Sequence, residues 1–353
     1  MPSVGDIPSS RFEPGHVYHD VENRVTVCFD WNDDRYIVHI DGTATGDKRE
    51  DDLIRRYKET HSDTEHSGDF EEEEAVRKEI FKAIIALGRP IFDKLSPREP
   101  VTTPESVVFT LNSFLFPSMY TFRFRTENNT TKLIQSPHED DDASRPSKPP
   151  GSLTISDKGS YLPRFSTKDL RVWVRLYGRG YVTHVKVDGQ NLDFCSKIAE
   201  DWRVKDVQRE LDTLLKIATS ERADELRVLK LRGLVVTPED GKIVGFLRDV
   251  IHQPRERSAV CNMQDIRDIS SISLTRRAKW AAQVTETVKL LHEIDVIWGD
   301  GKAGNALIDE NDDVWLIDFG GGFSNRWVTK ELTGTIEGDN LAVKRFWEFL
   351  KLS

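Results

Sequence analysis

Cysteine is scarce in this chain of 353 residues, and long apolar runs are missing. The three cysteines, Cys28, Cys195 and Cys261, are widely separated and odd in number, so they suit neither a zinc site nor a disulfide framework. Such usage favours a reducing compartment, and we expect a cytoplasmic or nuclear location. No run approaches the roughly 18 apolar residues of a membrane-spanning helix. Residues 1–15 also lack the basic start and apolar core of a secretory signal, so we expect no membrane partner.

An excess of positive charge is also lacking. The chain carries 50 Lys and Arg against 60 Asp and Glu, which gives a net charge of −10 at pH 7. This balance argues against a general nucleic-acid partner or an anionic membrane surface. Hydrophobic residues at 37% and charged residues at 31% are typical of a globular protein with polar loops. The length allows two domains, or one domain with a large extension.

The first part of the chain, residues 1–135, has the pattern of an α+β region of unknown role. Residues 1–15 are polar and carry Pro and Gly, which indicates a loose tail. The stretches "RVTVCFDW" and "RYIVHIDG" alternate apolar and polar residues on either side of the turn Asn32–Asp34, which predicts a β-hairpin. The highly charged segment 43–68 predicts a mobile loop.

A helix capped by Asp69 is expected next. The stretch "FEEEEAVRKEIFKAIIALG" has acids in its first turn, where the helix dipole favours negative charge, and apolar residues at helical spacing. The predicted buried stripe consists of Val76, Ile80, Phe81, Ile84, Ile85 and Leu87. The extended pair "MYTFRFRTENNTTKLIQ" closes the region, and the charged, proline-rich residues 136–164 predict a linker.

From residue 165 onwards the pattern is β-rich and then α-rich. Five expected strands, interrupted by the helix "VKDVQRELDTLLKIA", predict a small antiparallel sheet with a helix packed against it up to about residue 252. Residues 253–353 are mainly helical, with the last helix in "GDNLAVKRFWEFLKL". The helix beginning near Ser273 has an expected buried face made of Leu274, Ala278, Ala281, Val288 and Leu291. The whole chain is therefore expected to be α+β.

Polar residues gather in the stretch "GDGKAGN" and just after the apolar run "VWLI". The first supplies Asp300, Lys302 and Asn305, and the second is followed by Asp318. The runs "NALID" and "VWLID" flank a turn and predict a short hairpin that brings Asn305 and Asp318 together. An amide oxygen and a carboxylate suit a hard divalent cation whose other ligands come from phosphates and water. Asp300 could accept a hydroxyl proton, and Lys302 could neutralise phosphoryl charge.

The second half resembles the protein-kinase-like superfamily. "D-G-K-A-G-N" matches the catalytic loop D-x-K-x-x-N, and "D-F-G" is literal at Asp318–Gly320. The resemblance implies a bilobal fold over residues 165–353, with a β-rich N-lobe and a truncated α-rich C-lobe. It also implies ATP and Mg²⁺ as cofactors. Asp300 would orient or deprotonate the acceptor hydroxyl, and Lys302 would contact the γ-phosphate. Asn305 and Asp318 would hold the magnesium ion.

Upstream residues match the same family in order. Gly178 and Gly180 would begin the loop that covers the phosphates, although a G-x-G pair alone is most often a tight turn. The third glycine of that loop is replaced by Thr183, which puts a close approach to the phosphates in question. Lys197 stands where the family has its ATP-binding lysine, and Glu210 is its expected partner on the following helix. The alternative is an ordinary surface lysine and glutamate.

Other residues depart from the family pattern. Trp298-Gly299 replaces the usual His-Arg before the catalytic aspartate, and that arginine normally pairs with a phosphorylated activation loop, so such a switch is not expected here. The segment after Asp-Phe-Gly is short and has no A-P-E. Asp339 has two alternative interpretations, a brace for the catalytic loop or a plain cap of the last helix.

Three functions remain open. The first is a serine/threonine protein kinase, favoured by Lys302. The second is a kinase of small metabolites, since Gly299 and Gly304 are similar to the loop of choline and aminoglycoside phosphotransferases. The third is a pseudokinase scaffold that binds partners through residues 1–150. Retention of both metal ligands favours an active kinase, because clustered charge has no use without a cation. The compact second half is most similar in style to protein-kinase-like proteins of filamentous fungi.

Overall fold

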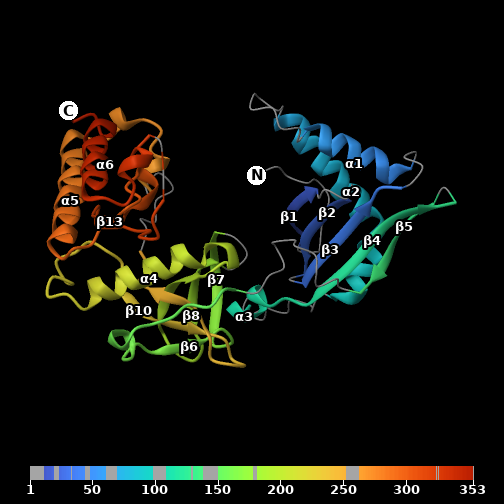
Figure 1. Ribbon diagram of the computed structural model, residues 1–353, viewed down its shortest axis with the longest axis horizontal. Helices are drawn as coiled ribbons and strands as arrows, with labels where there is room; N and C mark the ends of the chain where they lie inside the picture. The colour runs from blue at the N-terminus through green and yellow to red at the C-terminus, as the bar shows by residue number, and fades with distance from the viewer. Residues whose placement is uncertain are drawn as a thin grey trace. The chain divides into compact units, whose positions relative to one another are not determined.

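The computed structural model describes residues 12–19, 24–32, 34–43, 48–60, 70–97, 109–128, 130–137, 150–177, 181–251, 262–322, 324 and 326–352. The described chain is α+β, which confirms the fold class expected from the sequence (Figure 1). It divides into two compact units. Unit 1 is Met1–Val107 with Phe116–Lys148, and unit 2 is Val108–Leu115 with Pro149–Ser353.

Unit 1 contains one five-stranded sheet and two helices. The strands follow the order β1 to β5, and all neighbours are antiparallel except the parallel pair β3 and β4. They are β1 (Phe12–His19), β2 (Arg24–Trp31), β3 (Asp34–Asp41), β4 (Met119–Glu127) and β5 (Thr130–Ser136). Helices α1 (Arg49–Thr60) and α2 (Phe70–Leu95) lie between β3 and β4 in the chain and pack on one face of the sheet (Figure 1).

The core of unit 1 follows from alternation along its strands. Alternate residues of β2, β3 and β4 bury apolar side chains against the two helices, as a strand with one covered face requires. Phe29, Tyr36 and Phe92 form the aromatic centre. The rings of Phe29 and Tyr36 are stacked with their centroids 5.6 Å apart, and the rings of Tyr36 and Phe92 are tilted with their centroids 4.6 Å apart. The predicted hairpin is confirmed as β2–β3, and the turn residue Asn32 has a positive φ of 49°.

Two predictions for unit 1 are wrong. Residues 12–15 are not a loose tail, because β1 pairs with the edge of β2 through a bulge between Pro14 and Val17. The charged segment 43–68 is not all loop, because α1 forms within it and buries Leu53, Ile54 and Tyr57. Its many charged residues, of which Glu50 is itself buried, concealed this short apolar stripe in the sequence.

The helix predicted to follow Asp69 is longer than expected. Helix α2 continues through Pro90 to Leu95, and its predicted cap Asp69 lies outside the described residues. Val76, Ile80, Phe81 and Ile84 are buried as predicted, whereas Ile85 and Leu87 are partly buried against the same core. The predicted extended pair is confirmed as β4 and β5.

Unit 2 contains a six-stranded sheet in the order β6-β10-β11-β9-β8-β7. Its strands are β6 (Arg164–Ser166), β7 (Leu170–Tyr177), β8 (Val182–Val187), β9 (Asp193–Ile198), β10 (Leu231–Val236) and β11 (Ile243–Arg248). The five predicted strands are present. The sheet is nevertheless mixed, because the short β6, which the sequence pattern did not indicate, pairs in parallel with β10.

Each face of this sheet is covered by a helix. On one face, α4 (Val204–Ala218) buries Val207, Leu211, Leu214 and Leu215 of its predicted stripe in a core that includes Leu234 of β10, whereas Ala218, the fifth predicted residue, is partly buried. The next residue of β10, Val235, points to the opposite face and packs in the cluster of α3 (Leu111–Leu115). Residues 108–115 therefore belong to unit 2, although the sequence placed them in the N-terminal region.

The remainder of unit 2 is mainly helical. Helix α5 (Leu274–Glu293) begins at the N-cap Ser273, and α6 (Ile336–Phe349) lies beside it (Figure 1). Between them, β12 (Ala306–Ile308) and β13 (Val314–Leu316) form an antiparallel hairpin. Of the residues predicted for the buried face of α5, Ala281, Val288 and Leu291 are buried and Ala278 is partly buried. Leu274 is exposed because it lies in the first turn of the helix.

The predicted linker 136–164 is only partly described. Residues 150–164 are not a linker, since Gly151 N–H donates to Ala199 O at 2.8 Å and Leu153 N–H donates to Ile243 O at 2.7 Å. Leu153 is buried in the core of unit 2, which explains why this proline-rich stretch is ordered. Residues 138–149 lie outside the described part. Among the helices of the described ranges, none combines the length and apolar character that crossing a bilayer requires.

Candidate functional site

A buried lysine joins two elements of unit 2. Lys197 lies near the end of β9, and its Nζ donates to Glu210 Oε2 of α4 and, at 2.8 Å, to Asp318 Oδ1 after β13. Glu210 is fully buried and Lys197 is 8% exposed, so the bonds form away from bulk water. Burial opposes the charge of Lys197, but Glu210 and Asp318 together hold its pKa above the usual range. The amine therefore stays charged.

A second buried cation, Arg248, shares Glu210. It is the last residue of β11, is 6% exposed, and its Nη1 donates to Glu210 Oε1 at 2.9 Å. Burial alone would lower the pKa of Arg248, but Cys195 and Glu210 raise it, so the guanidinium is charged. The sequence analysis missed this residue, since a single arginine at a strand end carries no motif. Its position at the end of an otherwise apolar run was the one signal present.

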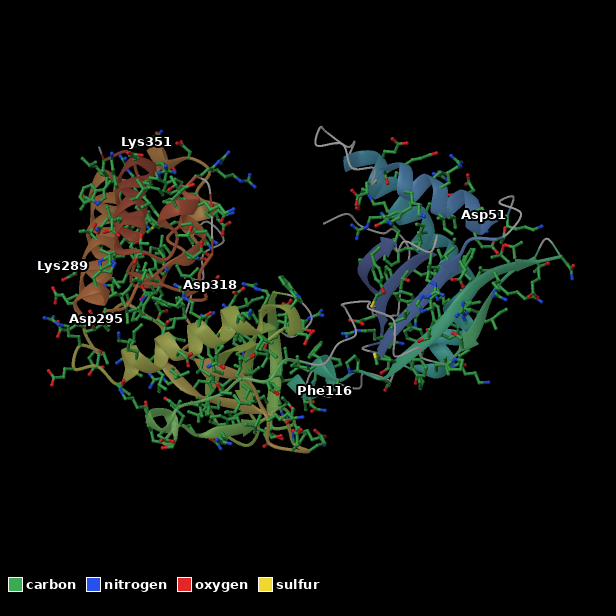
Figure 2. The ribbon with its side chains drawn as sticks, in the orientation of Figure 1. Asp51, Phe116, Lys289, Asp295, Asp318 and Lys351 are labelled. Carbon is green, nitrogen blue, oxygen red and sulfur yellow. The ribbon has the colours of Figure 1, made fainter. Side chains whose placement is uncertain are left out.

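Asp318 lies where the helical part of unit 2 meets α4 (Figure 2). It has a positive φ of 64°, and the next side chain, Phe319, is buried in the core. Burial would raise the pKa of Asp318, but the nearby charge and hydrogen bond of Lys197 hold it below the usual range. The carboxylate is ionised and still accessible, with 27% of its side chain exposed.

Three predicted residues of the "GDGKAGN" loop form a second cluster. Lys302 Nζ lies 2.6 Å from Asp300 Oδ2, and Asn305 Nδ2 donates to the carbonyl and the carboxylate of Asp300 at 2.9 and 3.0 Å. Burial raises the pKa of Asp300, and the negative charge of Asp318 adds to this rise, against the opposing effects of Lys302 and Asn305. Asp300 is thus a better proton acceptor than an exposed aspartate.

The predicted hairpin joins the two clusters. Ala306 pairs with Leu316, and Ile317 N–H donates to Asn305 O at 3.0 Å. Asn305 and Asp318 consequently lie at the open end of the β12–β13 hairpin, as expected. Gly322 completes the contact, because a Cβ at this position would lie 2.7 Å from Asp300 Cγ. Any larger residue here would displace the Asp300 carboxylate.

Asn305 and Asp318 fit a divalent cation that has phosphate and water as its further ligands. The amide nitrogen of Asn305 is used by Asp300, which leaves Oδ1 as its atom for a cation. Asp318 offers an ionised carboxylate. Over the described ranges there is no group of three or more His, Cys, Asp or Glu side chains arranged to hold a metal. A cation at this place would therefore need oxygen atoms from a bound phosphate.

Asp339 is a brace for the loop that carries Asp300. Its carboxylate accepts the backbone N–H groups of Trp298 and Gly299 at 2.8 and 2.9 Å, and it lies 2.9 Å from His292 Nε2. The N-cap of α6 is instead Thr335, whose hydroxyl accepts from Gly338 N–H at 3.0 Å. The brace interpretation of Asp339 is therefore confirmed and the cap interpretation is wrong.

Gly299 stands where the family pattern predicts an arginine, and its backbone conformation favours glycine at this position. Its φ is +80°, a region that strongly favours glycine. A Cβ at Gly299 would lie 3.0 Å from Nη2 of Arg209, and Gly321 (φ +79°) and Gly334 (φ +70°) border the same guanidinium. Arg209 of α4 thus occupies the space that an arginine at position 299 would need.

The predicted phosphate-covering loop can be assessed only in part. Gly178 and Gly180 lie outside the described residues. Thr183 lies on β8, is fully buried, and its Oγ1 is 2.6 Å from Ser196 Oγ. Because Ser196 and Lys197 are successive strand residues, they face opposite sides of the sheet, and Thr183 lies on the side away from Lys197. Its side chain therefore does not stand between the loop and Lys197.

The structure brings together Lys197, Glu210, Asp300, Lys302, Asn305 and Asp318 at one site of unit 2. No protein-family model matches the chain, and no curated protein matches it in sequence.

Proposed function

We propose that unit 2 is a bilobal protein-kinase-like domain that transfers the γ-phosphate of ATP to a hydroxyl group, with Mg²⁺ as cofactor. The order of its elements supports this proposal. A β-rich part with one helix, α4, precedes an α-rich part, and the polar cluster lies after α5 and around the β12–β13 hairpin. Each side chain implied by the sequence resemblance and described in the structure is found at this cluster.

One observation carries the proposal. Lys197 from β9 is bonded both to Glu210 of α4 and to Asp318 after β13, so three separate elements place their functional groups on one amine. A surface lysine and glutamate would not be buried in this way. A lysine fixed by a glutamate, beside an ionised carboxylate that is still partly exposed, is the arrangement needed to hold the phosphates of ATP beside a metal ion.

The nucleotide side of the proposed site comprises Lys197, Glu210 and the metal ligands. Lys197 would contact phosphate oxygens of ATP, and Glu210 would fix the position of the amine. Asn305 Oδ1 and a carboxylate oxygen of Asp318 would hold Mg²⁺, which neutralises phosphate charge when bound. Because Lys197 is bonded to Asp318 in this structure, ATP and the cation must compete for both partners.

The acceptor side comprises Asp300 and Lys302. Asp300 would accept the hydroxyl proton while the acceptor oxygen bonds to the γ-phosphorus. The bond from that phosphorus to the oxygen shared with the β-phosphate breaks, and ADP leaves with the electron pair. Lys302, 2.6 Å from Asp300, would stabilise the negative charge on the transferred group.

Serine or threonine hydroxyls of a protein are the proposed acceptors, because Lys302 beside the catalytic aspartate is typical of serine/threonine kinases. The cytoplasm or nucleus is the proposed place of the reaction, because the three cysteines of the sequence are few, widely separated and odd in number. A metabolite acceptor is the alternative that an experiment with labelled ATP separates, by offering a protein mixture and a metabolite extract in turn.

The proposal is tested first by ligand-dependent thermal stability. Saturating Mg²⁺-ATP should raise the melting temperature of the wild type, since a ligand stabilises the state that binds it. Asp318→Ala should remove most of the rise. Asp300→Asn should keep the rise and lose phosphate transfer, because Asp300 acts on the acceptor. No rise in the wild type would contradict the proposed function and favour a scaffold role.

A further inference from the structure

Arg248 is a charged group of this site that the proposed roles leave unused. It ends β11, is 6% exposed, and donates to the fully buried Glu210. Its Nε is a buried donor without a hydrogen-bond partner among the described residues, so the hydrogen bonds of the guanidinium are incomplete within that part of the chain. A buried arginine is retained against a large desolvation cost, and its contact with Glu210 is the feature that has to account for it.

The carboxylate of Glu210 is divided between two cations. Its Oε1 accepts from Arg248 at 2.9 Å, whereas its Oε2 accepts from Lys197. The two cations are not equivalent, because Lys197 is also bonded to Asp318 at 2.8 Å. Lys197 therefore has a second partner to move toward. Among the side-chain oxygens of the described residues, Arg248 donates to Glu210 alone.

We propose that Arg248 is the resident counter-ion of Glu210, a positioning residue that keeps this buried carboxylate paired and fixed in place when Lys197 turns toward the phosphates of a bound nucleotide. The part of this inference that concerns the release of Lys197 toward a nucleotide rests on the proposed function. With Arg248 in place, Glu210 keeps one ion pair whichever way the lysine points. Without Arg248, Lys197 would be the only cation bonded to Glu210, and its charge would be less available to ATP.

A second consequence concerns α4. The Arg248–Glu210 bond ties α4 to β11, independently of the Lys197 bond that ties it to β9. Two cations on two neighbouring strands thus hold one carboxylate of the helix, and β11 pairs directly with β9. The helix should therefore stay docked on the sheet when no nucleotide is bound and when Lys197 is removed.

The counter-ion role is tested by a double-mutant cycle in the full chain without nucleotide. The denaturation midpoint is measured for Lys197→Met, Arg248→Met and the double variant. Either cation alone can neutralise Glu210, so the decrease in the double variant should exceed the sum of the two single decreases. Adding Glu210→Gln to the double variant should recover much of the midpoint, because it removes the unpaired buried charge. Additive decreases without recovery would overturn the proposal.

Two further measurements keep the proposal testable if the double variant does not fold. Amide exchange in α4 should quicken in Arg248→Met more than in Lys197→Met, and equal exchange would overturn the second role. Affinity for Mg²⁺-ATP should fall about tenfold or more in Arg248→Met. Arg248→Lys should recover part of this loss, since an ammonium can replace the charge but not the fork of the guanidinium.

The matched control is Arg232→Met, on the neighbouring strand β10. Arg232 pairs with Asp249 at the surface, where both side chains are well exposed, so its loss should leave Mg²⁺-ATP affinity unchanged. If the wild type does not bind Mg²⁺-ATP, the proposed function is contradicted, and so is the proposed release of Lys197 toward a nucleotide. An additive midpoint cycle in a protein that binds Mg²⁺-ATP would contradict the counter-ion role alone.

Discussion

The Lys197 ammonium lies 2.8 Å from the Asp318 carboxylate, so the proposed phosphate-binding cation and the proposed metal ligand neutralise each other in the free protein. Asp300 lies close enough to feel the charge of Asp318, yet it is paired with Lys302 instead. The two aspartates therefore have opposite environments. The pKa of Asp318 is lowered below the ordinary value of 3.8, and that of Asp300 is raised above it.

These opposite shifts predict opposite effects of pH on stability. The depressed pKa of Asp318 means that its ionised form stabilises the fold above pH 3.8, and that this contribution disappears as pH falls through the lower folded pKa. The raised pKa of Asp300 means that the fold loses stability as pH rises from 3.8 through the folded pKa. Asp318→Asn should therefore destabilise the free protein at pH 7, whereas Asp300→Asn should stabilise it.

Urea denaturation of the three proteins between pH 3 and pH 7 checks this prediction. For each variant, the difference in unfolding free energy from the wild type should become smaller toward pH 3, where the carboxylates become protonated. If Asp300→Asn and Asp318→Asn change stability in the same direction at pH 7, the assigned electrostatics of the site are wrong.

Removal of Asp339 should weaken both the fold and catalysis. Asp339→Ala leaves the N–H groups of Trp298 and Gly299 without their buried acceptor, and should cost about 3 kcal/mol of unfolding free energy. It should also lower phosphate transfer, because the freed backbone carries Asp300. The matched control is Thr335→Ala, which removes the cap of the same helix and should cost about 1 kcal/mol with transfer retained. Equal losses in the two variants would contradict the brace.

The positive φ of Gly299 predicts that an added methyl group is costly there. Gly299→Ala should suffer both backbone strain of about 1–2 kcal/mol and contact with Arg209. Gly189, with φ +70° and open space around it, is the matched control for the strain alone. Adding Arg209→Ala to Gly299→Ala should remove the extra cost and leave the strain. Denaturation midpoints that rank Gly189→Ala as the more damaging change would contradict this account.

The short helix α3 predicts a stability link between distant parts of the chain. Leu111 is fully buried against the sheet of unit 2, so Leu111→Ala should cost about 3 kcal/mol. Amide exchange should quicken in β7 and β8 and stay unchanged in α1 and α2. The control is Leu176→Ala on β7, an exposed position where little should change. Faster exchange confined to unit 1 would show that residues 108–115 do not stabilise unit 2.

Much of the fold could be predicted because its elements have clear periodicity. The stripe of α4 and the alternation of β2 and β3 each bury one face, and both appear in the sequence as regular patterns. The elements that were missed have weak local signals. Helix α1 has three buried apolar residues among many charges, β6 has three residues in all, and α3 has five. Their positions depend on contacts with distant segments.

The candidate site likewise combines residues that local sequence motifs predict with residues that only the tertiary fold brings together. Asp300, Lys302, Asn305 and Asp318 lie in two short sequence motifs, and the intervening hairpin fixes their distance, so the sequence could bring them together. Arg248 lies 38 positions from Glu210 and meets it only because β11 pairs with β9 beneath α4. Arg209 meets three glycines from three different loops in the same way. Such contacts follow from the tertiary fold, which no local pattern encodes.

The most direct test of the phosphotransferase account is transfer of labelled γ-phosphate from Mg²⁺-ATP. Wild-type protein is incubated with a protein mixture and separately with a metabolite extract, beside Asp300→Asn at the same concentration. The account predicts label on serine or threonine residues of proteins with the wild type, and at least about a 100-fold lower rate with Asp300→Asn. Transfer at the wild-type rate by Asp300→Asn, or no transfer by either protein, would contradict it.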